Sequence, residues 1–125
     1  MKMITVDQLL IYHQKIIKAT GGANGIRDQG LLESVLGKVE QTFDGKELYP
    51  GLTRKIAVVA FSLIKNHGFV DGNKRIGVAV MLLLLRLNGY SIRYSQDELV
   101  QLGLGTAEGK LNEKDIEEWI VRHRE

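Results

Sequence analysis

The stretch from Lys74 to Asn88 is apolar on nearly every face of the helix that it predicts, and this constrains the fold more than any other feature. Its centre, Val78–Leu85, is an unbroken apolar run that ends at Arg86. That run is far shorter than the ~20 residues needed to span a bilayer. A helix without a polar face belongs at the centre of a bundle, because every face needs apolar neighbours. The stretch therefore predicts an all-α domain built around one buried helix.

Further helices are predicted around this one, to a total of about six. The stretch Ile56–Ile64 is almost entirely apolar and lies in a helix expected from Arg54 to about Asn66, with Thr53 as its N-cap. Gln41–Gly51 loses the helical period and predicts an ordered loop or a short hairpin, and Tyr90–Tyr94 predicts a short extended piece. The other helix N-caps are predicted at Thr5, Asp28, Ser95 and Asn112, with capping-box partners at Gln8 and Glu98 for the first and third.

Composition narrows the class of protein. The 125 residues suit a single domain, 1–125, without a linker or repeat. There is no cysteine, which excludes disulfides and thiolate metal sites. The net charge of +2, with acids and bases interspersed, gives no reason to expect DNA binding. Met1–Gln8 lacks the basic start and apolar core of a signal peptide. A cytoplasmic protein without membrane contact is expected.

The segment His67–Arg75, between the two most apolar helices, carries the chemistry. His67 closes the earlier helix, and Asp71-Gly72-Asn73 has the composition of a turn. Lys74 and Arg75 fall in the first turn of the next helix, where the helix dipole favours acids instead of cations. The unpaired N–H groups of a helix N-terminus also bind phosphates. Two cations at such a position therefore predict an anion supplied from outside.

These residue types suit the transfer of a phosphate-containing group. Imidazole groups in general change protonation state near neutral pH, so a histidine such as His67 can take a proton from an attacking hydroxyl. Asp71 is a hard oxygen ligand of the kind that binds Mg²⁺ together with phosphates. Phe69, between polar neighbours, is expected to point inward and anchor the loop. Each feature also has a plain structural reading, as a helix cap, a turn or a solvated face. His13 and His123 are expected at the surface.

The segment resembles the signature of the Fic family, His-x-Phe-x-(Asp/Glu)-Gly-Asn-Gly-Arg-x-x-Arg. The matching residues are His67, Phe69, Asp71, Gly72, Asn73 and Arg75. Lys74 and Val78 depart from it, as in the Doc (death-on-curing) branch of the family. The resemblance to that branch extends to Gly25–Ser34, Gln41–Phe43, Leu48–Pro50 and Leu87–Tyr90.

The resemblance implies a Fic-type helical bundle and the toxin of a type II toxin–antitoxin module. Such a toxin would transfer the γ-phosphoryl group of ATP, with Mg²⁺, to a hydroxyl of a translation factor similar to elongation factor Tu, and so halt translation. His67 would be the catalytic base and Asp71 the Mg²⁺ ligand. Phosphate would be bound by Gly72, Asn73, Lys74 and Arg75.

Two other functions stay open. One is adenylyl transfer, typical of other Fic proteins. Against it, Lys74 fills the space that a glycine would leave for phosphate, and Val78 removes one phosphate clamp. The second is a catalytically silent module that only binds its antitoxin, a short repressor-like protein with a disordered tail. Glycine at position 68 is unusual for the branch and is expected to loosen the loop.

Regulation and substrate alignment follow from the same resemblance. An internal inhibitory helix is not expected, because Leu104 replaces the hydroxyl residue that should precede Glu108-Gly109, so restraint would come from the antitoxin. Gln41–Pro50 occupies the place of the flap that aligns the target's main chain, or is a plain connecting loop.

Overall fold

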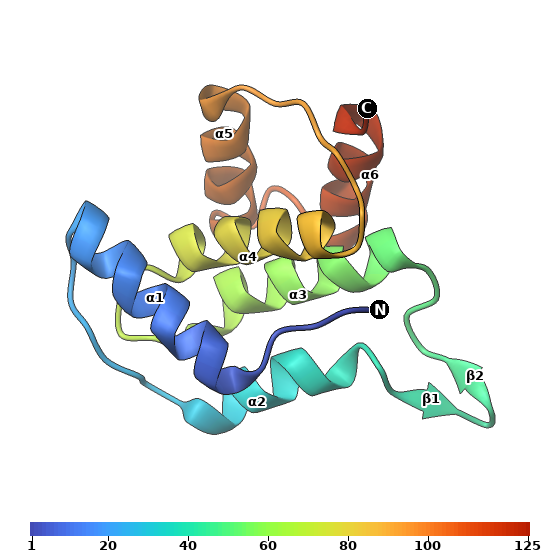
Figure 1. Ribbon diagram of the computed structural model, residues 1–125, viewed down its shortest axis with the longest axis horizontal. Helices are drawn as coiled ribbons and strands as arrows, with labels where there is room; N and C mark the ends of the chain where they lie inside the picture. The colour runs from blue at the N-terminus through green and yellow to red at the C-terminus, as the bar shows by residue number, and fades with distance from the viewer.

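The computed structural model describes all 125 residues, Met1–Glu125, and contains six helices and one small hairpin (Figure 1). The helices are α1 (Val6–Thr20), α2 (Gln29–Lys38), α3 (Leu52–Asn66), α4 (Asn73–Leu87), α5 (Gln96–Ala107) and α6 (Glu113–His123). The strands are β1 (Thr42–Phe43) and β2 (Lys46–Glu47). The predicted all-α bundle with a small hairpin is confirmed.

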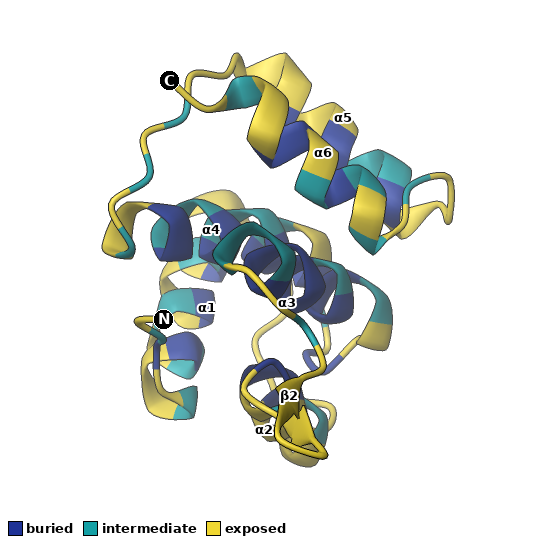
Figure 2. Ribbon diagram, turned by 90° about the vertical axis from the view of Figure 1, so that its right-hand side faces the viewer, coloured by how far each residue is buried: buried dark blue, intermediate teal, exposed yellow.

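Helices α3 and α4 form the middle layer of the molecule. Helices α1 and α2 lie on one side of it and α5 and α6 on the other (Figures 1 and 2). On α3, the consecutive residues 56–60 are all at most 1% exposed, so every face of this stretch is covered. On α4, Ile76, Val80, Met81 and Leu84 are fully buried. The apolar runs thus form the centre of one core of 23 buried residues, which includes side chains from all six helices.

The two central helices approach closely at Gly77 of α4. A Cβ atom there would lie 2.4 Å from Cγ1 of Ile64 and 3.2 Å from the carbonyl oxygen of Ala60. A glycine inside a helix normally costs about 1 kcal/mol relative to alanine. Here it lets α4 contact the backbone of α3, which places the loop between the two helices tightly against the core.

The predicted N-caps bond as expected in four of five helices. The capping residues that accept a backbone N–H are Thr5, Asp28, Ser95 and Asn112. The prediction for Thr53 was wrong, because α3 begins at Leu52 after Gly51, whose positive φ of 90° turns the chain into the helix. The Thr53 hydroxyl instead donates to Oε2 of Glu117 on α6, at 3.2 Å.

The hairpin is a two-residue turn fixed to the body of the protein by a lysine. Asp44 and Gly45 both have positive φ, 52° and 76°, as the favoured hairpin turn requires. Lys55, only 5% exposed, lies with its Nζ 3.2 Å from Oε1 of Glu47 and donates to the carbonyl of Val39 at 2.7 Å. The hairpin therefore lies beside the N-terminal end of α3.

Helices α5 and α6 are joined by His123, which we expected at the surface and which is partly buried there. Its ring stacks on Trp119, with centroids 4.0 Å apart, and its Nδ1 lies 2.7 Å from the Trp119 carbonyl. Its Nε2 lies 2.6 Å from Oε2 of Glu98. The hydrogen bond from His123, followed by those from Ser95, lowers the pKa of Glu98 from 4.5 to about 2.

Replacement of Glu98 with glutamine should change the acid stability of the protein. A lowered folded-state pKa stabilises the fold above the unfolded value, and this contribution is lost as the pH falls from 4.5 towards 2. Glutamine still fits the capping box. We expect the urea midpoint of Glu98→Gln to lie below that of wild type at about pH 7, and the difference between the two midpoints to be smaller at about pH 3. An equal difference between the midpoints at both pH values would contradict this.

None of the helices combines the length and the apolar character needed to cross a membrane.

Candidate active site

The loop between α3 and α4 begins with a strained histidine. His67 is the C-cap of α3 and adopts left-handed backbone angles, φ 51° and ψ 52°, which are uncommon for a residue other than glycine. Arg27 holds it there, because its Nε donates to the His67 carbonyl at 2.6 Å and its Nη2 to the Asn66 carbonyl at 3.3 Å. Such strain persists where the surroundings enforce it, often at functional sites. The side chain of His67 is left exposed.

A second segment, residues 25–28, is bonded to this loop along its length. Gly68 accepts backbone hydrogen bonds from Arg27 at 2.8 Å and Asp28 at 3.0 Å, and Val70 donates to Gly25 at 3.1 Å. A Cβ atom at position 68 would lie 2.4 Å from Cδ2 of Leu32. Gly68 thus permits close packing on α2, and its carbonyl ties the loop to residues 27 and 28.

The same contacts correct the position of the proposed flap. The hairpin precedes α3 and the motif loop follows it, so the 15-residue helix, about 22 Å long, separates the two (Figure 1). Residues 22–28 border the motif loop instead, with Ile26 bridged to Phe69. Gln41–Pro50 could not be placed from the sequence, because its position depends on the direction in which α3 runs.

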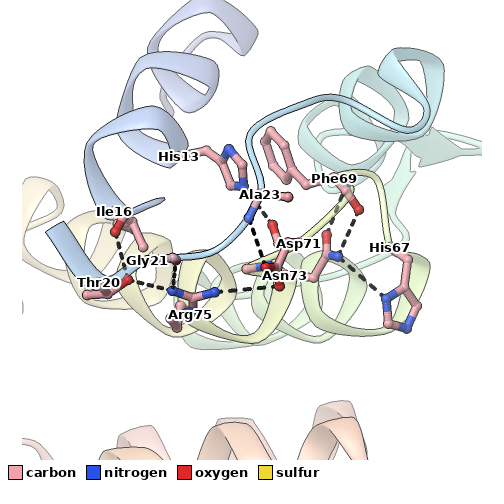
Figure 3. Close-up of polar contacts among 11 residues, drawn as sticks. His13, Ile16, Thr20, Gly21, Ala23, His67, Phe69, Asp71, Asn73 and Arg75 are labelled. Carbon is pink, nitrogen blue, oxygen red and sulfur yellow. Dashed lines mark hydrogen bonds and ion pairs between the residues drawn. The ribbon is translucent and has the colours of Figure 1, made fainter. Parts of the chain in front are cut away.

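On the core side of the loop, Phe69 is buried and stacked on a buried histidine. Phe69 is 1% exposed, and its ring centroid lies 3.8 Å from that of His13, with the planes only 7° apart (Figure 3). His13 is 2% exposed and its Nε2 lies 2.7 Å from the Asp71 carbonyl. The expectation that His13 is a surface residue was wrong. The missed signal was its spacing of four from Leu9 and Ile17, which places all three on the buried face of α1.

Asn73 closes the loop by bonding to its backbone. Its Oδ1 accepts from the Phe69 N–H and its Nδ2 donates to the Phe69 carbonyl, both at 3.0 Å (Figure 3). The same Nδ2 lies 3.5 Å from Nδ1 of His67, the outer limit of a hydrogen bond. Asn73 is only 7% exposed, so its amide faces loop and imidazole more than solvent.

Asp71 is held as an ionised carboxylate. Its Oδ2 accepts from the Ala23 N–H at 3.0 Å and its Oδ1 from the Gly72 N–H at 2.8 Å. These two hydrogen bonds, and more weakly the nearby Arg75, lower the pKa of Asp71 below its usual value. Gly22 makes this possible, because a Cβ atom there would lie 2.5 Å from Oδ2. Ala23 was not anticipated from the sequence, since it contributes only a backbone N–H.

A magnesium ion fits this donor set. The Asp71 side chain is 46% exposed, and Mg²⁺ typically takes one or two carboxylates together with phosphate oxygens and water. The protein has no group of three or more His, Cys, Asp or Glu side chains able to hold a metal ion by themselves. Asp71 would therefore hold the ion jointly with a phosphate ligand.

The two cations in the first turn of α4, Lys74 and Arg75, differ in their surroundings. The Nη1 of Arg75 donates to the Thr20 hydroxyl and, at 2.7 Å, to the Gly21 carbonyl, and its Nη2 lies 3.6 Å from Oδ1 of Asp71. Arg75 therefore ties the end of α1 to the start of α4. Lys74 is exposed and its ammonium has no hydrogen bond or ion pair within the protein. It is the cation most available to a ligand.

The start of α4 is left open to an anion. Its N-cap, Gly72, has a positive φ of 79° and no side chain to bond the first N–H groups. A hollow of about 310 Å³ lies against this helix end. Its lining includes every predicted site residue except Phe69, which lies beneath it: His67, Asp71, Gly72, Asn73, Lys74 and Arg75, with Ile64, Val70 and Ala107. An imidazole, an ionised carboxylate, a free ammonium and an uncapped helix N-terminus thus surround one space.

Comparison with known proteins identifies the family of this chain. The model of the Fic/DOC family matches residues 3–85. The chain is 30% identical over 125 residues to the protein kinase doc of Escherichia phage P1, an alignment that covers 98% of this chain and 95% of the relative. It is 39% identical over 74 residues to the toxin Doc of Mycolicibacterium smegmatis, covering 59% of this chain and 57% of that relative. With the motif and the six-helix fold, these matches show that the chain belongs to the Fic/DOC family, in its Doc branch.

Proposed function

We propose that this protein is the toxin of a type II toxin–antitoxin module and that it transfers the γ-phosphoryl group of ATP to a hydroxyl of a protein substrate. The substrate proposed is a translation factor similar to elongation factor Tu, whose modification would halt translation. The observation that carries the proposal is the unpaired ammonium of Lys74 in the same hollow as His67 and Asp71. The relative that aligns over nearly the whole chain is named a protein kinase.

The reaction follows from the residues around the hollow. His67 takes the proton of the acceptor hydroxyl while the oxygen of that hydroxyl forms a bond to the γ-phosphorus. The bond from that phosphorus to the β–γ bridging oxygen breaks, and ADP leaves with the bonding pair. Lys74, Arg75 and the N–H groups at the start of α4 stabilise the charge on the phosphate oxygens. Magnesium bound at Asp71 would neutralise further phosphate charge.

Adenylyl transfer is the second candidate reaction, and two positions argue against it. Lys74 fills the space that the glycine of the Fic signature would leave beside the phosphates. A nucleotide therefore cannot approach the backbone as closely as it could beside that glycine. Val78 faces an adjoining hollow and supplies no cation there. A catalytically silent module is the third candidate. The Asp71 carboxylate accepts two backbone hydrogen bonds, and the backbone carbonyl of the exposed His67 accepts one from Arg27, and both features argue for an active site.

The test is label transfer from ATP carrying its label in either the γ- or the α-phosphate, with Mg²⁺ and purified elongation factor Tu. Label from the γ-phosphate alone is the expected result. Label from the α-phosphate would instead assign the protein as an adenylyl transferase. Absence of transfer from both labels would exclude elongation factor Tu as the substrate. The same assay on a broader set of translation factors would then decide between another target and the silent module.

Replacement of Lys74 with alanine should weaken γ-phosphoryl transfer by about 10- to 100-fold, the effect of losing one hydrogen bond to a charged group, about 1.5–3 kcal/mol. The matched control is Lys114→Ala, because Lys114 is also exposed and is also the second residue of its helix, α6. Its helix start is capped by Asn112 and lies outside the hollow. Equal rates for the two variants would remove Lys74 from the phosphate site.

An antitoxin would restrain the enzyme from outside the chain. A hollow of about 230 Å³ between α1, α4 and α5 is lined partly by Ile16, Leu99 and Val100, and it shares Lys74 and Arg75 with the phosphate hollow. An apolar segment of the antitoxin that carries carboxylates would fit this hollow and compete with phosphate for the same cations. Saturating antitoxin should abolish label transfer. An antitoxin that binds and leaves transfer unchanged would contradict this arrangement.

A further inference from the structure

A buried histidine outside the motif contacts the motif backbone from the core side. His13 lies in the middle of α1, is 2% exposed, and stacks face to face on Phe69 (Figure 3). Its Nε2 lies 2.7 Å from the carbonyl oxygen of Asp71, 58 residues away in the chain. A carbonyl oxygen only accepts hydrogen bonds, so Nε2 must carry the proton and donate it. This assigns the hydrogen-bonding role of a polar ring that would otherwise be costly to bury.

The bond from His13 fixes a peptide group that matters to the site. The carbonyl of Asp71 and the N–H of Gly72 belong to one planar unit and point in opposite directions. With the carbonyl held by His13, the N–H is directed at Oδ1 of Asp71, 2.8 Å away. One side of the peptide is thus fixed to α1, while the other orients the carboxylate proposed to hold magnesium.

The same contact leaves little space around the start of α4. A Cβ atom at Gly72 would lie 2.9 Å from Cδ1 of Ile17 and 3.4 Å from Nε2 of His13. Gly72 also has a positive φ of 79°, which suits glycine alone at low cost. His13 and Ile17 therefore enforce the turn that exposes the first N–H groups of α4 to the hollow.

We propose that His13 is a positioning residue for phosphoryl transfer, which holds the Asp71–Gly72 peptide so that the Asp71 carboxylate and the start of α4 face the phosphates. This inference rests on the proposed function. His13 does not line the hollow and contacts no reacting atom. Its effect is transmitted through one hydrogen bond to the backbone.

Two substitutions separate the hydrogen bond from the packing. His13→Phe keeps an aromatic ring against Phe69 and removes the donor, whereas His13→Gln places an amide N–H near the position of Nε2 and removes the ring. We expect His13→Phe to lower kcat/KM for ATP by about 10-fold and to raise the Mg²⁺ concentration for half-maximal rate, since a lost hydrogen bond releases the carboxylate. His13→Gln should recover most of both.

The matched control is His123→Phe. His123 also stacks on an aromatic ring and also bonds a backbone carbonyl, but it joins α5 to α6 outside the hollow. We expect it to leave kcat/KM and the Mg²⁺ dependence unchanged. If folded His13→Phe matches wild type in both quantities, or if His13→Gln loses as much as His13→Phe, the proposal is overturned.

A measurement independent of activity distinguishes this proposal from the proposed function. Hydrogen exchange of the Gly72 N–H, followed by NMR, should be about 10-fold faster in His13→Phe, because the peptide is no longer held. The Asn88 N–H, at the other end of α4, should exchange at its wild-type rate. Unchanged exchange at Gly72 would overturn the role of His13. If the wild-type protein shows no phosphoryl transfer and the Gly72 N–H still exchanges faster in His13→Phe, the result would confirm that His13 holds this peptide. It would then refute only the assigned reaction.

Discussion

Replacement of His67 should lower phosphoryl transfer by about 10²- to 10⁴-fold, the usual contribution of a general base. The side chain is exposed and its only polar contact is the 3.5 Å approach to Asn73. The fold should therefore survive its removal. The measurement is kcat/KM for transfer of γ-label, with circular dichroism and thermal unfolding to verify the fold.

Two versions of this substitution separate loss of the base from backbone strain. At the left-handed angles of position 67, alanine is strained, whereas asparagine tolerates this conformation. Neither can act as a base near neutral pH. Both His67→Ala and His67→Asn should therefore show the same large loss of rate. Recovery of the rate in the asparagine variant would mean that the backbone conformation, and not the imidazole, is what catalysis needs.

The control for both variants is Lys65→Ala, in the last turn of the same helix. Lys65 is a partly exposed cation close to His67 in sequence, and it does not line the hollow. We expect it to retain the wild-type rate. A loss comparable to that of His67→Ala would point to a general disturbance at the end of α3.

Truncation of Leu84 should produce the largest loss of stability. Leu84 is fully buried in α4, the helix that contacts α1, α3 and α5. Leucine-to-alanine changes at such sites lower the free energy of unfolding by about 2–5 kcal/mol, because the removed methyl groups leave a cavity. That is a large part of the total of about 5–15 kcal/mol expected for a domain. Urea unfolding at neutral pH measures it.

The matched control is Leu87→Ala, the same chemical change one turn further along the same helix. Leu87 is 40% exposed, so less apolar surface returns to water, and we expect a loss of less than about 1 kcal/mol. Similar losses for the two variants would mean that α4 is not the buried centre of the fold. Because α4 also begins at the site, unfolding of this helix should abolish label transfer. On heating, Leu84→Ala should therefore lose label transfer at a lower temperature than Leu87→Ala.

The sequence predicted features that depend on neighbours within the chain. The apolar periods placed α3 and α4 at the centre, since an all-apolar helix has no face suited to water. The residues from His67 to Arg75 came together because they are consecutive, across one turn and the first turn of a helix. Local hydrogen bonds likewise determined the capping residues Thr5 and Ser95.

Tertiary structure alone decided the contacts between distant segments. Arg27, Ala23 and His13 reach the motif across 40 to 58 residues, and each acts through a backbone group or on one, so residue type gave little signal. The position of the hairpin also depended on the direction of α3, which no local pattern specifies. Period and capping are properties of one segment, whereas a hydrogen bond between segments exists only after their helices have packed. The sequence thus determined the fold class and the chemistry of the motif, and packing decided what holds the motif in place.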